Sequence, residues 1–147
     1  MSPSLMRAET AKQIAVQGIV TGTVQKVGFR AHILKTAIRY NLAGMTKNQD
    51  DGTVIFTLQG DSKRIERALN EIRAGTKKST VESVTVTPAE FNPAINTFTV
   101  LAWTSHSRKI TTPYDLIFTQ RQKDDIISRA AAKKEFDRIL ETTIKVP

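Results

Sequence analysis

The chain has 147 residues, no cysteine, two histidines and a formal net charge of +8 at pH 7. The lack of cysteine excludes disulfides and thiolate chemistry, and two histidines are too few for an ordinary metal cluster, so we expect neither a metal nor a cofactor. No apolar run approaches the roughly 20 residues that span a bilayer, and the first residues lack the apolar core of a secretory signal, so we expect a cytoplasmic protein. The basic charge favours anionic ligands without naming one.

The first predicted elements are a strand, a glycine-rich turn and a helix. Residues 1–12 show no periodicity and are predicted to form a flexible arm. Over residues 14–21 apolar side chains recur at every second position, as in a strand with one buried face. Over residues 29–40 they recur at helical spacing, and Asn41 suits the left-handed end of a helix. The turn at residues 22–28 therefore precedes a helix N-terminus, where backbone N–H groups can bind an anion.

A hairpin and a second helix follow. Residues 44–48 and 53–59 are predicted as two strands, and the Asp-Gly pair at 51–52 suits the positive φ of the turn between them. Asp61 can cap the second helix through its carboxylate, and Gly75 can end it. This hairpin is the clearest local prediction in the sequence.

Two more strands complete the predicted domain. Residues 81–86 form the fourth strand, which Pro88 is expected to stop, and residues 97–103 form a fifth. The order strand, helix, strand, strand, helix, strand is that of a split βαβ unit. We therefore predict an α+β, ferredoxin-like domain over residues 13–106, with two helices on one face of an antiparallel sheet.

Residues 107–147 do not continue this pattern and are predicted as a mainly helical C-terminal extension. Residues 111–114 are interpreted as a connector and 119–141 as a helix. The apolar residues of that helix fall on two opposite sides, so it should bend, break or contact two surfaces. The extension can pack on its own sheet, form a homo-oligomer or hold a protein partner, and the sequence does not choose among these.

Two motifs in residues 13–101 resemble those of the acylphosphatase family. That family has a loop of the form Gly-x-Val-Gln-Gly-Val-x-Phe-Arg, and the chain has Gly-Thr-Val-Gln-Lys-Val-Gly-Phe-Arg at 22–30. The family also has Gly-x-Val-x-Asn before a hairpin turn that ends in Asp-Gly, which Gly44, Asn48 and residues 51–52 match. A single glycine-rich turn would be weak support, whereas two motifs at the family's spacing are specific.

The resemblance implies hydrolysis of the carboxyl–phosphate bond of small acyl phosphates. It implies that Arg30 and the loop bind the phosphate and that Asn48 positions the attacking water. The expected phosphate-binding residues are Gln25, Lys26, Val27, Gly28, Phe29 and Arg30. Simple chemistry agrees, because arginine offers a planar fork to phosphoryl oxygens and an amide can hold a water without titrating. Arg30 and Asn48 are thus the expected catalytic residues.

Two departures from the family pattern keep other functions open. Lys26 stands where the family has glycine, and Thr46 stands where it has valine. If the loop needs a left-handed backbone at residue 26, a Cβ there costs on the order of 1 to 2 kcal/mol. The alternative is a catalytically weak or inactive module that binds anions or proteins. An RNA-binding domain would share the topology, but residues 53–59 offer only Phe56 for base stacking, so nucleic-acid binding is disfavoured.

Overall fold

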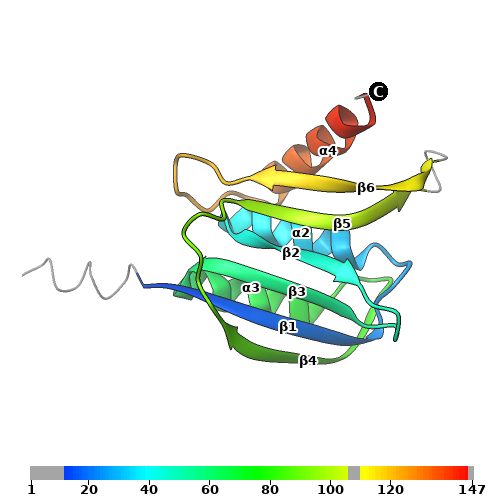
Figure 1. The fold of residues 1–147 in the computed structure, drawn as a ribbon, viewed down its shortest axis with the longest axis horizontal. Helices are drawn as coiled ribbons and strands as arrows, with labels where there is room; N and C mark the ends of the chain where they lie inside the picture. Colours follow the sequence, from blue (N-terminus) through cyan, green and yellow to red (C-terminus); the bar gives the residue numbers. More distant parts are fainter. Residues whose placement is uncertain (1–11, 106–109, 146–147) are drawn as a thin grey trace, which may run out of the picture.

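The first strand, β1 (Gln13–Thr23), pairs on both sides in a six-stranded sheet (Figure 1). The computed structural model describes residues 12–105 and 110–145. The other strands are β2 (Ala43–Asn48), β3 (Val54–Asp61), β4 (Thr80–Ala89), β5 (Thr97–Ser105) and β6 (Ile110–Thr119). The helices are α2 (Phe29–Tyr40), α3 (Ser62–Ala74) and α4 (Arg129–Lys145).

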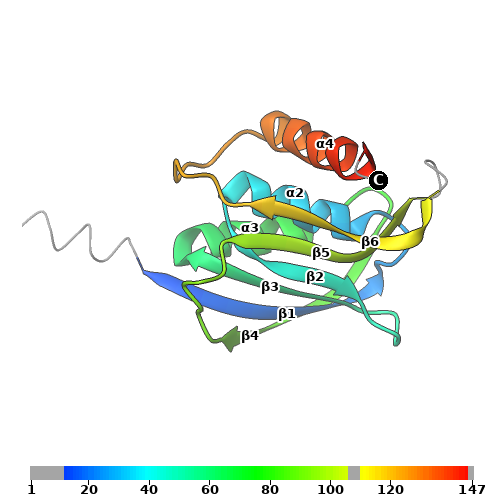
Figure 2. The ribbon, with the colours of Figure 1, turned by 45° about the horizontal axis from the view of Figure 1, so that its top comes forward.

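The strands lie in the order β4-β1-β3-β2-β5-β6. Neighbouring strands are antiparallel except β2 and β5, which run parallel. α2 and α3 cover one face of the sheet, and α4 packs against α2 and β6 on the same side (Figure 2). The predicted ferredoxin-like α+β fold is confirmed, and the parallel pair makes the sheet mixed.

Most local signals act as predicted. α2 spans residues 29–40, and Asn41 ends it with φ 54°. The carboxylate of Asp61 caps α3 by accepting the N–H groups of Lys63 at 2.9 Å and Arg64 at 3.1 Å. The prediction that Pro88 stops the fourth strand is wrong, because β4 continues past it. β4 is an edge strand, and an edge strand tolerates proline where no ladder partner needs its N–H.

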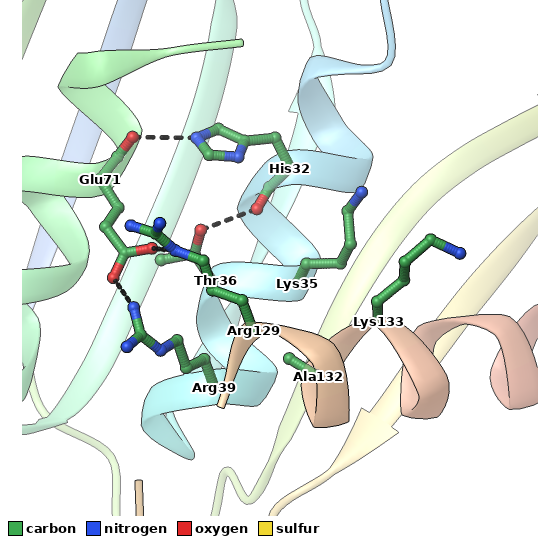
Figure 3. Close-up of a pocket in the computed structure, with 8 residues that line it drawn as sticks. All are labelled: His32, Lys35, Thr36, Arg39, Glu71, Arg129, Ala132 and Lys133. Atoms are coloured by element: carbon green, nitrogen blue, oxygen red, sulfur yellow. Dashed lines mark hydrogen bonds and ion pairs between the residues drawn. The ribbon is translucent and has the colours of Figure 1, made fainter. Parts of the chain in front are cut away.

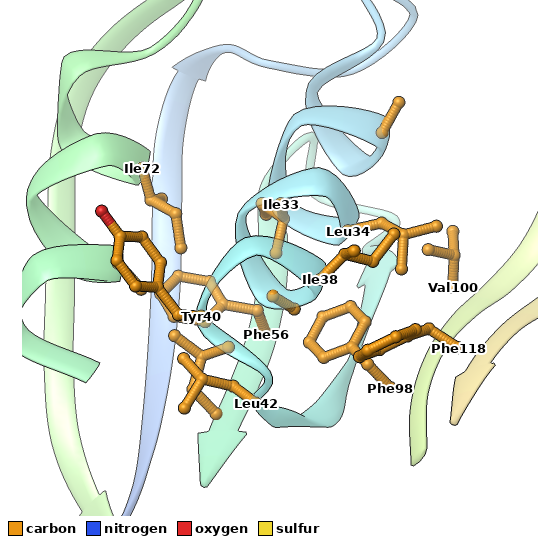
Figure 4. Packing of buried hydrophobic residues seen from close by; sticks show 14 of the residues in the cluster. Ile33, Leu34, Ile38, Tyr40, Leu42, Phe56, Ile72, Phe98, Val100 and Phe118 are labelled. Carbon is orange, nitrogen blue, oxygen red and sulfur yellow. The ribbon is translucent and has the colours of Figure 1, made fainter. Parts of the chain in front are cut away.

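The helix α2 is buried on more than the single stripe that its sequence predicts. Eight of its twelve residues are buried. Ile33, Leu34 and Ile38 point toward apolar side chains of the sheet, among them Phe56 and Phe98 (Figure 4). Since α4 lies against another side of α2, residues outside the predicted stripe are also shielded from water. The sheet, α3 and α4 therefore all pack on this one helix.

The residues predicted as a connector, 111–114, instead lie in β6, so that interpretation is wrong. Leu116 and Phe118 of β6 are buried, and Ile117 between them is 52% exposed, which is the alternation of a strand with one buried face. Pro113 and the apolar Ile117 obscure this pattern in the sequence. Both are tolerated because β6 is the edge strand beside β5.

The helix predicted over 119–141 begins only at Arg129. Ile126 and Ile127 precede α4, so the two opposite apolar sides belong to different segments. The buried face of α4 consists of Ala132, Phe136, Ile139 and Leu140. The expected break therefore lies before Arg129, and the helix itself presents one apolar face to the domain.

The loop between β6 and α4 caps the C-terminus of α2. The Arg121 side chain donates from Nη1 to the Ile38 carbonyl at 2.7 Å, and the Gln120 amide donates to the Asn41 carbonyl at 2.7 Å. The Arg121 N–H donates to Asn41 Oδ1 at 2.7 Å. These donors satisfy carbonyl groups that a helix end leaves unpaired, and a cation is favourable there. In the described residues the extension thus packs on its own domain.

The remaining expectations concern the N-terminal arm, His106, membrane-spanning helices and metal sites. The arm predicted at residues 1–12 lies, apart from Lys12, outside the described residues, and so does His106. Within residues 12–105 and 110–145 no helix is long and apolar enough to cross a bilayer. The same ranges contain no group of three or more His, Cys, Asp or Glu residues that could hold a metal ion.

Candidate active site

The turn between β1 and α2 is shaped by residues with positive φ. Gly22 has φ 123°, and a Cβ there would lie 2.0 Å from the carbonyl oxygen of Thr80, so a larger residue would displace β4. Gly28, with φ 75°, is the N-cap of α2, and because it has no side chain it leaves the N–H groups of the first turn uncapped. The N–H groups of that turn can therefore donate to a bound anion.

Lys26 is exposed and has φ 64°, a left-handed conformation that a glycine would adopt with less strain. We expect Lys26→Gly to raise the unfolding free energy by about 0.5 to 1 kcal/mol, because relief of strain exceeds the added freedom of the unfolded chain. Thermal or urea unfolding measures this change. Lys26→Ala is the matched control, since it removes the charge but keeps the Cβ and the strain. A glycine variant no more stable than the alanine variant would contradict the explanation.

Arg30 lies in the first turn of α2 and is anchored by the backbone of β5. Its Nη1 donates to the Leu101 carbonyl at 2.6 Å, with a longer contact of 3.4 Å to the Ala102 carbonyl. Burial lowers the pKa of Arg30 below its ordinary value, yet a guanidinium stays protonated in proteins. No carboxylate of the described residues forms an ion pair with it. The site therefore holds a partly buried cation without a counter-ion from the described part of the chain.

Asn48 is the last residue of β2 and carries an unsatisfied acceptor. Its Oδ1 is buried and has no hydrogen-bond partner among the described residues. Such atoms are rare in proteins and often mark the place of a water or ligand. Thr46, the second departure from the family pattern, is fully buried and donates its hydroxyl to the Ile55 carbonyl at 2.9 Å. The threonine is thus accommodated within the sheet beside the site.

Gln25 joins the loop to the turn between β2 and β3. Its Nε2 donates to the carbonyls of Gln49 at 2.7 Å and Thr53 at 2.8 Å. Both donor hydrogens of this amide are thereby directed at the hairpin, so the predicted phosphate contact of Gln25 rests on its backbone N–H. The same hydrogen bonds fix the loop relative to Asn48, the neighbour of Gln49.

These elements surround a pocket of about 500 Å³. Its lining consists of Val24, Lys26, Gly28, Phe29, Arg30, Asn48, Ala102, Trp103 and Thr104. Most of the predicted site residues meet at this pocket, whereas Gln25 and Val27 are not part of its lining. Residues 102–104, from the end of β5, were missed by the sequence interpretation. No motif marks them, and they reach the pocket because β5 runs parallel beside β2.

A second pocket, of about 250 Å³, lies among α2, α3 and α4 (Figure 3). His32 Nε2 is 2.9 Å from the Glu71 carbonyl oxygen, which can only accept, so this nitrogen carries the proton. Burial lowers the pKa of His32 below its ordinary value, and this imidazole is therefore neutral at pH 7. The Glu71 carboxylate accepts from Arg39 at 2.6 Å and from the Tyr40 hydroxyl, and pairs with Arg129 at 3.6 Å. These groups already satisfy one another. Arg39, Tyr40, Glu71 and Arg129 thus form a clasp, a polar cluster that joins the three helices.

We expect Glu71→Ala to lower the unfolding free energy by about 1 to 3 kcal/mol, because it removes the carboxylate that accepts from Arg39 and from the hydroxyl of the buried Tyr40. Urea unfolding followed by circular dichroism measures the change. Glu66→Ala, at an exposed position of α3, should stay within about 0.5 kcal/mol of the unmodified chain. Equal stability of the two variants would show that the clasp contributes nothing.

Fold and pocket together define an α+β domain of the ferredoxin-like type with a pocket, lined by the partly buried Arg30, at its first strand-to-helix turn. A family model described as Acylphosphatase matches residues 16–100. The acylphosphatase of Chlorobaculum tepidum is 39% identical over 92 residues, which cover 63% of this chain and 98% of that relative. The acylphosphatase of Methanocella arvoryzae is 38% identical over 76 residues, which cover 52% of this chain and 86% of the relative.

A solved structure agrees with these sequence matches. The crystal structure of acylphosphatase from Bacillus subtilis superposes with a TM-score of 0.56 at 30% identity, covering 58% of this chain and 94% of that one. The chain therefore belongs to the acylphosphatase family of enzymes, and the resemblance seen in the two motifs is confirmed. The family match ends at residue 100, so β6 and α4 lie beyond it.

Proposed function

We propose that the chain hydrolyses small acyl phosphates to a carboxylate and phosphate. A water oxygen attacks the phosphorus, and the bond from phosphorus to the bridging oxygen breaks. The electron pair of that bond leaves on the carboxylate, while the protons of the water end on phosphate or in solvent. An acyl phosphate has a good leaving group, so the reaction depends chiefly on positioning and on stabilisation of charge.

The observation that carries this proposal is that Arg30 and Asn48 line the same pocket, and that each has a polar group free to bind a ligand. Arg30 is a cation without a described counter-ion, and Asn48 has a buried oxygen without a described partner. With Nη1 on the Leu101 carbonyl, the other guanidinium nitrogens remain for phosphoryl oxygens. The loop N–H groups bind the remaining oxygens, and Asn48 accepts a hydrogen bond from the attacking water.

The alternative is an anion-binding module that turns over slowly or not at all. It is favoured by one observation, the strained backbone of Lys26 within the loop whose N–H groups bind the phosphate. Strain at a functional site is also compatible with catalysis, because the surrounding structure can hold it. Gln25 supplies such support through its two hydrogen bonds to the hairpin.

Hydrolysis of benzoyl phosphate by the purified full chain tests the proposal. The proposed function predicts a rate well above that in buffer and competitive inhibition by inorganic phosphate. Phosphate binding in a titration, with benzoyl phosphate decaying as in buffer, would favour the inactive module. The absence of both binding and turnover would reject the proposed site altogether.

A further inference from the structure

The candidate active site has a wall that the family match does not include. Ala102, Trp103 and Thr104 line the pocket, yet the match ends at residue 100. The relative from Chlorobaculum tepidum is aligned over 98% of its length within 92 residues. The segment after β5 is therefore an addition to the family's domain, and it packs behind the wall that the end of β5 places in the pocket.

A bulge in the hairpin of β5 and β6 directs this wall. The strand register shifts between Val100 and Trp103, and Ala102 has φ 55°. The Ala102 N–H donates to Asp115 Oδ1 on β6 at 3.1 Å, which replaces the ladder hydrogen bond that the bulge removes. Bulges commonly re-aim a side chain next to an active site. Here the bulge immediately precedes Trp103.

Trp103 is held from two sides. Its ring meets the Phe136 ring of α4 edge-on, with centroids 6.4 Å apart and an interplanar angle of 80°. The Arg30 guanidinium carbon lies 5.6 Å from the Trp103 ring centroid. Phe136 is itself buried, so α4 gives the indole a rigid backing. The aromatic wall thus adjoins the cation that holds the phosphate in the proposed function.

The pocket is large enough for more than a phosphate group. Its volume is about 500 Å³, within the range of roughly 300 to 1,000 Å³ that small-molecule sites span. The phosphate end is defined by Gly28, Arg30 and Asn48, and the aromatic wall lies beside it. The acyl group of a substrate bound there would extend along Trp103.

We propose that the end of β5, backed by β6 and α4 of the C-terminal extension, forms an acyl-group subsite in which Trp103 packs against a planar aromatic acyl group. This inference rests on the proposed function, because it assumes that the phosphate lies at Arg30. The chain then prefers aryl acyl phosphates such as benzoyl phosphate over acetyl phosphate. An aromatic contact of this kind changes selectivity by roughly five- to tenfold.

Kinetics of benzoyl and acetyl phosphate test the subsite. In Trp103→Leu the ratio of the two kcat/KM values should fall roughly five- to tenfold in favour of acetyl phosphate, whereas Trp103→Phe should keep most of the preference. Ile117→Ala, at an exposed position of β6, serves as the control and should keep the ratio. An unchanged ratio in a folded Trp103→Leu variant would overturn the subsite while leaving the proposed hydrolysis intact.

A binding measurement tests the subsite without turnover. Trp103 is the only tryptophan of the chain, so intrinsic fluorescence reports on it directly. Benzylphosphonate, which cannot be hydrolysed at an acyl bond, should change this fluorescence, and excess inorganic phosphate should reverse the change. Methylphosphonate at equal occupancy should change it much less. Equal responses to the two phosphonates would overturn the subsite, even if the chain proved to be an inactive binding module.

Discussion

Arg30→Lys is expected to lower kcat/KM for benzoyl phosphate by about 10³-fold, as arginine contacts to a transferring phosphoryl group are worth at least this much. Arg30 uses one nitrogen on the Leu101 carbonyl and keeps the rest of its planar fork for the phosphate. A lysine ammonium is a point charge on a flexible stem and cannot fill both roles in that geometry. Steady-state kinetics give the change, and inhibition by inorganic phosphate should weaken in parallel.

The matched control for this variant is Arg73→Lys, which makes the same substitution at an exposed position of α3. It conserves net charge and should leave kcat/KM unchanged. Circular dichroism of Arg30→Lys should show a folded protein, because the substitution keeps a single positive charge at this partly buried position. A folded Arg30→Lys variant with nearly full activity would exclude the proposed phosphate contact.

Asn48→Ala is expected to lower kcat by about 10²-fold with a smaller change in KM. A group that orients the attacking water acts mainly in the transition state, and loss of one such contact costs on this scale. The Oδ1 of Asn48, which has no partner in residues 12–105 and 110–145, is the atom proposed to accept from the water. Because the alanine variant also removes a buried unsatisfied oxygen, its stability should be equal to or above that of the unmodified chain.

Asn70→Ala, at an exposed position of α3, is the control for Asn48→Ala and should retain full kcat. The two variants separate the role of the amide in the pocket from any general effect of the substitution. If Asn48→Ala raised KM alone and kept kcat, the asparagine would be a binding residue and the proposed role in positioning water would be wrong.

The local elements near the site could be predicted because each has its own signal in neighbouring residues. The spacing of apolar residues defines α2, the Asp-Gly pair defines the hairpin, and the side chain of Asp61 caps α3. The loop at residues 22–28 could be placed because it joins two such elements. The sequence raised a left-handed backbone at Lys26 only as a condition, and its φ of 64° meets that condition.

The far side of the pocket could not be predicted, because it depends on contacts between distant segments. The Leu101 carbonyl contacts Arg30 only because β5 runs parallel beside β2, and no sequence pattern near Leu101 predicts that pairing. The strand β6 was missed since Pro113 and Ile117 hide its alternation, which an edge strand can afford. The position of Trp103 depends on the bulge that precedes it and on Phe136 of α4, and neither can be inferred from the residues around it.

The capping of α2 by the extension has a consequence for the order in which the chain folds. The loop, Arg30 and Asn48 precede Leu101 and Arg121 by more than 50 residues and leave the ribosome before them. Yet the hydrogen bond from Arg30 to Leu101 spans 71 residues, and that from Arg121 to Asn41 spans 80. Long-range contacts of this kind form late, because closing long loops is slow. The proposed catalytic residues are thus synthesised well before the segments whose contacts complete their geometry.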